Sequence, residues 1–178
     1  MNGKTFLMLS ELFEQFRVQA LALVKEAEQA GFLDDLTNCY NRRAFDIRLE
    51  QLQGLPGVCV MFVDVNGLKQ VNDTQGHLAG DLVLKGLGKM LKAHFGGNDV
   101  FRVAGDEFLV LKANQKPKVF ELLVEEFKAT INCTHKTSVA IGCGCTSETK
   151  DLKSVLAETE QKMYADKKKF YQIKQIKN

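Results

Sequence analysis

Two adjacent carboxylates, Asp106 and Glu107, stand at the centre of the stretch FRVAGDEFLVL, residues 101–111. The residues on either side are rich in β-branched and aromatic types, which favours two strands joined by a turn at Ala104 and Gly105. The pattern therefore predicts a β-hairpin with two negative charges at its tip. Because like charges repel, this arrangement is unfavourable unless water or a cation screens the carboxylates.

A third carboxylate ends a strand that we expect in the centre of the sheet. The segment GVCVMFVDV, residues 57–65, is almost entirely apolar, which is typical of a central strand. Asp64 lies near its end, where it either caps a following helix or lies at the rim of the sheet. If this strand neighbours the hairpin, three carboxylates converge. Such a cluster suits a hard cation, Mg²⁺ or alternatively Mn²⁺, whose usual partner is a polyphosphate.

Polar side chains are concentrated between the strand and the hairpin. In DVNGLKQVNDTQGHLAGD, residues 64–81, they are Lys69, Asn72, Asp73, His77 and Asp81. An amide and a carboxylate, here Asn72 and Asp81, can read the donor and acceptor edge of guanine. A lysine can approach a phosphate as a point charge. Each residue alone is weak evidence, but their closeness to a candidate metal ligand favours a nucleotide site.

The composition is that of a globular protein. The chain has 178 residues, 45% of them apolar and 26% charged, and is long enough to bury a full core. Its net charge of +2 gives no strong case for nucleic acid as a partner. We recognise no signal peptide and no run of about 18 apolar residues, so we expect no membrane within this chain and a cytoplasmic location. The five cysteines contain no CxxC pair, which favours reduced, mostly buried thiols over a disulfide or a zinc site.

The remaining periodicity predicts the elements that position these residues. Helices are expected at residues 41–53, 77–95, 117–131 and 151–174, and strands at residues 57–65, on both sides of the hairpin turn and at residues 136–145. This order predicts an α+β fold with one mixed sheet and with helices mainly on one face of it.

The first part of the chain predicts a separate helix. Its apolar residues alternate spacings of three and four, as in a heptad seam: Phe6, Leu9, Phe13, Phe16, Ala20, Leu23, Ala27 and Ala30. This helix either packs on its own domain or pairs with a second copy as a parallel coiled coil, and we favour the coiled coil. Gly31 is the expected helix stop. We therefore expect a stalk at residues 1–31 and a globular domain at residues 32–178.

Four sequence blocks resemble the GGDEF family of diguanylate cyclases. In chain order they are DDLTNCYNRRAF, VDVNGLKQVNDTQGHLAGD, RVAGDEFLVL, and SVAIGCG followed by KMYADKKK; together they span about residues 34–168. The resemblance implies a ferredoxin-like palm domain, similar to that of nucleotidyl cyclases. It also implies that a homodimer with facing active sites condenses two GTP into cyclic di-GMP and two pyrophosphates.

The resemblance further implies a role for each candidate residue. Asp64, the backbone carbonyl of Val65, Asp106 and Glu107 would bind the metal. Asp106 would also act as, or near, the general base on a ribose 3′-hydroxyl, and Lys69 would stabilise charge at the reacting phosphates. The residues that would contact GTP are Asn72, His77, Asp81, Ala104, Gly105 and Lys167, with Asn72 and Asp81 on guanine and Lys167 on the terminal phosphates. The chemistry is metal-assisted phosphoryl transfer.

The chain departs from the family pattern at several positions. Ala104 replaces the first glycine of the motif, which would strain the backbone if this position needs a positive φ and would otherwise crowd the guanine. Asn38 also replaces a glycine, and asparagine tolerates the left-handed region. The other departures are Asn66 for aspartate, Leu68 for phenylalanine, and Thr159 and Glu160 for an alanine–aspartate pair.

The family's product-inhibition site is also missing. The aligned stretch FGGN, residues 95–98, lacks the arginine and the aspartate of that site, and Arg102 is expected to be a surface residue of the hairpin. Two readings other than an active cyclase stay open. One is a catalytically silent GGDEF domain that binds GTP or relays a signal, and the other is a cyclase that makes a different dinucleotide.

Overall fold

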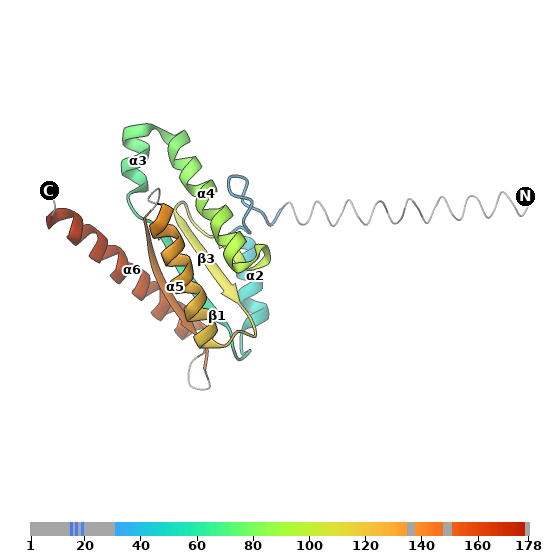
Figure 1. Ribbon diagram of the computed structural model, residues 1–178. Coiled ribbons are helices and arrows are strands. Elements are labelled where there is room, and N and C mark those ends of the chain that lie inside the picture. The colour runs from blue at the N-terminus through green and yellow to red at the C-terminus, as the bar shows by residue number, and fades with distance from the viewer. Residues whose placement is uncertain are drawn as a thin grey trace, which may run out of the picture. The chain divides into compact units, whose positions relative to one another are not determined.

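The computed structural model describes residues 31–134, 138–147 and 151–176, together with Gln15, Arg17 and Gln19 (Figure 1). The chain divides into two units, Met1–Leu33 and Asp34–Asn178, and the fold below is that of the second unit. Gln15, Arg17 and Gln19 are helical. The predicted stalk otherwise lies outside the described residues, so it stays a prediction, as does the domain boundary at residue 31.

Four strands form one sheet in the order β2-β3-β1-β4. They are β1 (Cys59–Val65), β2 (Val100–Arg102), β3 (Glu107–Lys112) and β4 (Val139–Cys145). All neighbouring pairs are antiparallel, so the predicted α+β fold is confirmed, whereas the prediction of a mixed sheet is wrong for the described strands. The reason is that β3 lies between β1 and β2, and β1 lies between β3 and β4. Strands that run in the same direction are therefore never neighbours, as in ferredoxin-like folds.

Five α-helices and one short 3₁₀-helix complete the described part of the domain. They are α2 (Arg42–Leu52), α3 (Leu68–Gln75), α4 (His77–Phe95), η1 (Gly97–Asp99), α5 (Pro117–Thr134) and α6 (Leu152–Ile176). The four predicted helices are found with small shifts at their ends. Helix α3 was not predicted as an element of its own, because it is short and buries none of its residues. None of the described helices has the length and apolar character needed to cross a membrane.

Helices cover both faces of the sheet (Figure 1). Helices α4 and α5 pack on one face, where Leu87, Leu91, Phe120 and Phe127 contact the apolar side chains of the strands. Helices α2 and α6 pack on the other face through Phe45, Leu52, Leu152 and Val155. The expectation of helices mainly on one face is therefore wrong. Six of the seven residues of β1 are buried, and a strand buried on both faces needs a layer on each side.

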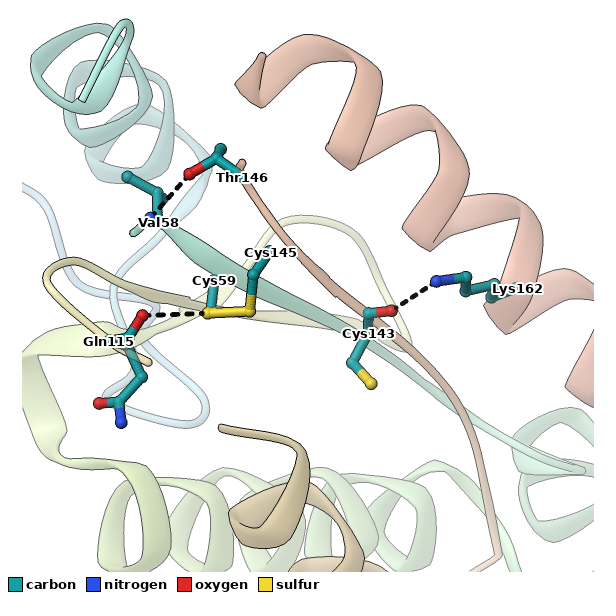
Figure 2. The surroundings of a disulfide bond; sticks show 7 residues. All are labelled: Val58, Cys59, Gln115, Cys143, Cys145, Thr146 and Lys162. Carbon is teal, nitrogen blue, oxygen red and sulfur yellow. Dashed lines mark hydrogen bonds between the residues drawn. A yellow bond between two sulfur atoms is a disulfide. The ribbon is translucent and has the colours of Figure 1, made fainter. Parts of the chain in front are cut away.

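Helix α6 lies directly against the edge strand β4. A side chain at Gly142 would collide with the α6 backbone at Thr159 and Met163, so glycine permits this close approach. The outward backbone N–H of Ile141 donates to Asp166 Oδ2 at 3.0 Å. Lys162 Nζ in turn donates to the backbone carbonyl of Cys143 at 3.0 Å (Figure 2).

Strands β1 and β4 are also joined by a disulfide between Cys59 and Cys145 (Figure 2). These residues are direct partners in the antiparallel register. Cys39, Cys133 and Cys143 are free. The prediction that the cysteines are reduced thiols is therefore wrong for this pair. The two cysteines are 86 residues apart, and only the sheet order places them opposite each other.

Candidate functional site

The three carboxylates lie at the same end of the sheet. Asp64 on β1 is the direct partner of Glu107 on β3. Asp106 precedes β3, and its backbone carbonyl accepts a hydrogen bond from the N–H of Val65 at 3.2 Å. The structure thus brings together the four residues expected to bind metal. The alternative role of Asp64 as a helix cap is excluded, because the N-cap of α3 is Gly67.

Asp64 is the most buried of these carboxylates, with 1% of its surface exposed. Its Oδ2 accepts a hydrogen bond from Lys167 Nζ at 2.6 Å, while its Oδ1 is buried without a hydrogen-bond partner. Burial raises the pKa of Asp64, and the charge of Asp106 adds to this, although the hydrogen bond from Lys167 opposes it. Burial likewise raises the pKa of Glu107, together with the charges of Asp64 and Asp106. The cluster therefore favours a cation close to it.

Lys167 supplies one positive charge to the cluster from α6. Its partial burial alone would lower the pKa of its ammonium group. The hydrogen bond to Asp64 and the negative charges of Asp64 and Asp106 outweigh burial, so the pKa of Lys167 is raised. Lys167 therefore stays protonated beside the carboxylates and donates to Asp64. It is the residue predicted to hold the terminal phosphates, and that role stays a prediction.

The carboxylate and carbonyl oxygens of this site suit a hard divalent cation, although the carboxylate side chains do not surround a common point. Within the described ranges, no three Asp, Glu, His or Cys side chains converge closely enough to hold a metal. The Oδ1 atom of Asp64 is nevertheless a buried carboxylate oxygen without a hydrogen-bond partner, and Mg²⁺ prefers oxygen ligands of this kind. The residues present therefore fit the ion, with Asp64, Glu107, Asp106 and the Val65 carbonyl as its candidate ligands.

The candidate guanine-binding residues lie where α3 meets α4. The Oδ1 atom of Asn72 lies so close to Gly80 that a side chain at that position would collide with it. The amide of Asn72 is therefore held beside the residue that precedes Asp81. Both Asn72 and Asp81 are half-buried, whereas Lys69 and His77 are exposed. The pairing of Asn72 and Asp81 on guanine stays a prediction.

The turn at Ala104 and Gly105 is exposed, and neither residue has a positive φ. In the part of the chain that the structure describes, Asn38 and Asn114 are the non-glycine residues with positive φ, both at 54°. Ala104 is therefore not strained. At Gly105 an added Cβ would meet no atom within 4 Å. Asn38 adopts the left-handed conformation that its side chain was expected to tolerate.

Arg102 is a site residue that the sequence reasoning missed. Its guanidinium donates to Asp34 Oδ1 and Oδ2 at 3.0 and 3.1 Å, and to the backbone carbonyl of Gly105 at 2.7 and 3.2 Å. Only 13% of its side chain is exposed, so the prediction of a surface residue is wrong. Arg102 therefore fixes the backbone one residue before Asp106. No pattern within a segment signals this pair, because Asp34 and Arg102 are 68 residues apart.

The fold and this cluster together define a ferredoxin-like palm domain of the nucleotidyl-cyclase type. The family model "Diguanylate cyclase, GGDEF domain" matches residues 31–171. The chain belongs to the GGDEF family.

Individual relatives agree with this assignment. The probable diguanylate cyclase DgcI of Escherichia coli is 31% identical over 141 residues, which are 78% of this chain and 32% of that protein. The GGDEF domain of TpbB (YfiN) from Pseudomonas aeruginosa is 28% identical, with a TM-score of 0.66, and the match covers 77% of this chain and 89% of that one.

The same fold recurs in a structure of the coiled coil and GGDEF domain of DgcB from Caulobacter crescentus in complex with c-di-GMP. The match has a TM-score of 0.76 and 21% identity, and covers 91% of this chain and 94% of that one. The chain spans less than half the length of the first curated relatives it matches.

Proposed function

We propose that this chain is a diguanylate cyclase that condenses two GTP into cyclic di-GMP and two pyrophosphates. The observation that carries the proposal is the pairing of Asp64 with Glu107 across β1 and β3, with Asp106 beside them and Lys167 bound to Asp64. Three carboxylates and a lysine at one rim of the sheet suit a nucleoside triphosphate with its cation better than they suit a neutral ligand.

In the proposed reaction the side chains of this chain align two reacting groups. Asn72 and Asp81 hold the guanine, while Lys69 and Lys167 hold the phosphates. Asp106 accepts the proton of a ribose 3′-hydroxyl, either directly or through water, and the 3′-oxygen forms a bond to the α-phosphorus of the second GTP. The bond from that phosphorus to the bridging oxygen breaks, and pyrophosphate leaves. A bound Mg²⁺ or Mn²⁺ would neutralise charge on the phosphates and favour the attacking oxygen.

The product needs two nucleotides, so two copies of the domain must face each other. We propose that each copy binds one GTP and that residues 1–31 link two copies as a coiled-coil stalk. A linked pair meets at an effective concentration of order millimolar, whereas separate domains at low concentration meet rarely. The heptad spacing from Phe6 to Ala30 supports this part of the proposal.

The proposal is tested by incubating the protein with GTP and Mg²⁺ and separating the products by chromatography. We expect cyclic di-GMP and pyrophosphate in a ratio of about one to two. Asp106→Asn should abolish the product, whereas the matched control Asp46→Asn, an exposed carboxylate on α2, should retain the activity. GTP binding without product by the wild-type protein would instead support a silent GTP-binding domain.

A further inference from the structure

The disulfide between β1 and β4 joins two sulfurs that differ in their access to solvent. Cys59, in the central strand, is completely buried, with 0% of its surface exposed. Cys145, the last residue of the edge strand, is only half-buried. In thiol–disulfide exchange an outside thiolate must reach one of the two sulfurs, so access decides which of them reacts. A thiol from solution therefore meets Cys145 first.

A cavity of about 350 Å³ lies beside this sulfur. Its lining includes two cysteines, two carboxylates and an ammonium group, contributed by Cys143, Cys145, Glu121, Glu158 and Lys162. Thr159 also lines the cavity, and its hydroxyl is buried without a hydrogen-bond partner. Groups of both charges suit a ligand that carries both an ammonium and a carboxylate group. The cavity therefore suits a small peptide thiol.

The pairing of β1 with β4 at this end of the sheet does not depend on the disulfide. The backbone N–H of Val58 donates to the hydroxyl oxygen of Thr146 at 2.9 Å (Figure 2). The backbone N–H of Thr146 donates in return to the carbonyl of Val58 at 2.8 Å. Each of these residues is the chain neighbour of one cysteine. These two hydrogen bonds therefore keep Cys59 and Cys145 opposite each other when the disulfide is broken.

The structure also contains a partner for the reduced form of Cys59. The Sγ atom of Cys59 lies 3.8 Å from the backbone carbonyl oxygen of Gln115 (Figure 2). A sulfur in a disulfide has no proton to donate, so this contact becomes a hydrogen bond only when Cys59 is a thiol. The buried sulfur that is released on reduction therefore finds an acceptor in place.

The nearby free thiol of Cys143 does not replace an outside thiol in this exchange. Cys143 lies opposite Met61 in the register, not opposite a cysteine. Burial raises the pKa of Cys143, although Lys128 and Lys162 oppose this, so little of it is thiolate at neutral pH. The attacking thiolate therefore comes from solution.

We propose that the Cys59–Cys145 disulfide is a reversible thiol-modification site at which small peptide thiols react with Cys145. A thiolate attacks the Sγ atom of Cys145, the bond between the two cysteines breaks, and Cys59 leaves as a thiolate and is protonated. A second thiolate attacks the outer sulfur of the mixed disulfide and forms the disulfide of the small thiol. Cys145 leaves as a thiolate and is protonated. The protein disulfide gains two electrons and two protons, which the two small thiols lose. This inference goes beyond the proposed function and does not depend on it.

The first test asks which sulfur reacts. The parent protein is the full chain with Cys133→Ser and Cys143→Ser, in which the cysteines that remain are Cys39, Cys59 and Cys145. A further Cys59→Ser or Cys145→Ser leaves one member of the pair as a thiol. Each variant is incubated with oxidised glutathione without denaturant, and peptide mass spectrometry measures the mixed disulfide. We expect Cys145 to react at least about tenfold faster than the buried Cys59. Cys39, which is also completely buried, is the internal control.

The second test asks whether the exchange takes place in the folded protein. The parent protein is treated with dithiothreitol without denaturant, and thiols are then counted by alkylation in denaturant. The count should rise from one to three while the circular dichroism spectrum stays the same, and oxidised glutathione should restore a count of one. A disulfide that dithiothreitol reduces only at urea concentrations that unfold the protein would overturn the proposal. Reaction of Cys59 as fast as that of Cys145 would overturn it as well.

Discussion

The guanidinium of Arg102 binds both carboxylate oxygens of Asp34 and, with its remaining N–H groups, the backbone carbonyl of Gly105. One side chain thereby ties the start of the domain to the turn that presents Asp106. Asp34 also accepts hydrogen bonds from the backbone N–H and the hydroxyl of Thr37, at 2.9 and 2.7 Å. The position of Asp106, the proposed general base, thus depends on residues that lie outside the cluster of three.

Arg102→Lys should lower both stability and turnover. A lysine has no planar fork of donors, so it cannot bind Asp34 and Gly105 together. We expect a loss of about 1.5–3 kcal/mol in the free energy of unfolding, the range for hydrogen bonds to charged groups, and a lower cyclase rate because the turn at Asp106 loosens. Urea unfolding and product formation would measure these effects.

The matched control for this experiment is Arg42→Lys. Arg42 and Asp46 form an exposed pair with 64% and 53% of their side-chain surfaces accessible, so the change should cost less than about 1 kcal/mol. Equal effects of the two substitutions would contradict the positioning role of Arg102.

The pH dependence of stability should reveal the same interaction. Burial raises the pKa of Asp34, but hydrogen bonds from Thr37 and Arg102 outweigh burial and bring it below its ordinary value of 3.8. Because the folded-state pKa is the lower one, the stabilisation is complete above pH 3.8 and is lost as the pH falls through the folded-state pKa. The difference in unfolding free energy between the wild type and Asp34→Asn should therefore be constant near neutrality and shrink in strong acid. A difference that grows on acidification would contradict this assignment.

Asp64→Asn should remove metal binding without unfolding the protein. The substitution keeps the shape of the side chain. It relieves repulsion among the carboxylates but weakens the interaction with Lys167, so the two effects oppose each other and stability should change little. Cyclase turnover should fall by about a hundredfold or more, since charge neutralisation by the metal is worth several kcal/mol. Calorimetric titration with Mn²⁺ measures the metal directly, with Asp46→Asn as the control. A variant that still binds Mn²⁺ as the wild type does would remove Asp64 from the ligand set.

Ala104→Gly separates the two explanations for the altered motif. The backbone at Ala104 has no positive φ, so glycine relieves no strain and should slightly lower stability through the entropy of the unfolded chain. We expect tighter GTP binding or faster turnover, because a methyl group is removed where the backbone would approach the nucleotide. Unchanged affinity and turnover would mean that the site already accommodates alanine.

Reduction of the Cys59–Cys145 disulfide should lower the unfolding temperature. The cross-link spans 86 residues, for which the chain-entropy model gives about 4–5 kcal/mol of stabilisation. In denaturant, alkylation should count three thiols before treatment with a dithiol and five afterwards. Cys143→Ser, which removes a free thiol nearby, should leave the dependence of stability on the dithiol unchanged. Five alkylated thiols in the protein isolated without a dithiol would contradict the disulfide.

Short-range patterns predicted the elements of this fold well. The apolar run of β1, the hairpin around Asp106 and the helices α2, α4, α5 and α6 all follow from local periodicity and turn residues. The meeting of Asp64 with Glu107 could be expected only on the condition that β1 neighbours the hairpin. The structure meets this condition, because β1 lies beside β3 in the sheet.

The missed features depend on residues that are distant in sequence. The disulfide, the Arg102–Asp34 pair and the Tyr171–Gly67 contact join residues 86, 68 and 104 positions apart. Spacing within a segment carries no information on such pairs. The mixed sheet was predicted wrongly for the same reason, because strand order decides which strands are neighbours.

The contacts of α6 with β4 bear on how two copies of this domain can associate. An edge strand normally offers a row of free N–H and C=O groups, on which a strand of another molecule can pair and begin aggregation. Here Asp166 already occupies the outward N–H of Ile141, and Lys162 occupies the outward carbonyl of Cys143. Two side chains of opposite charge thus protect this edge. Copies of the domain should therefore meet through side-chain surfaces rather than by extending the sheet across β4.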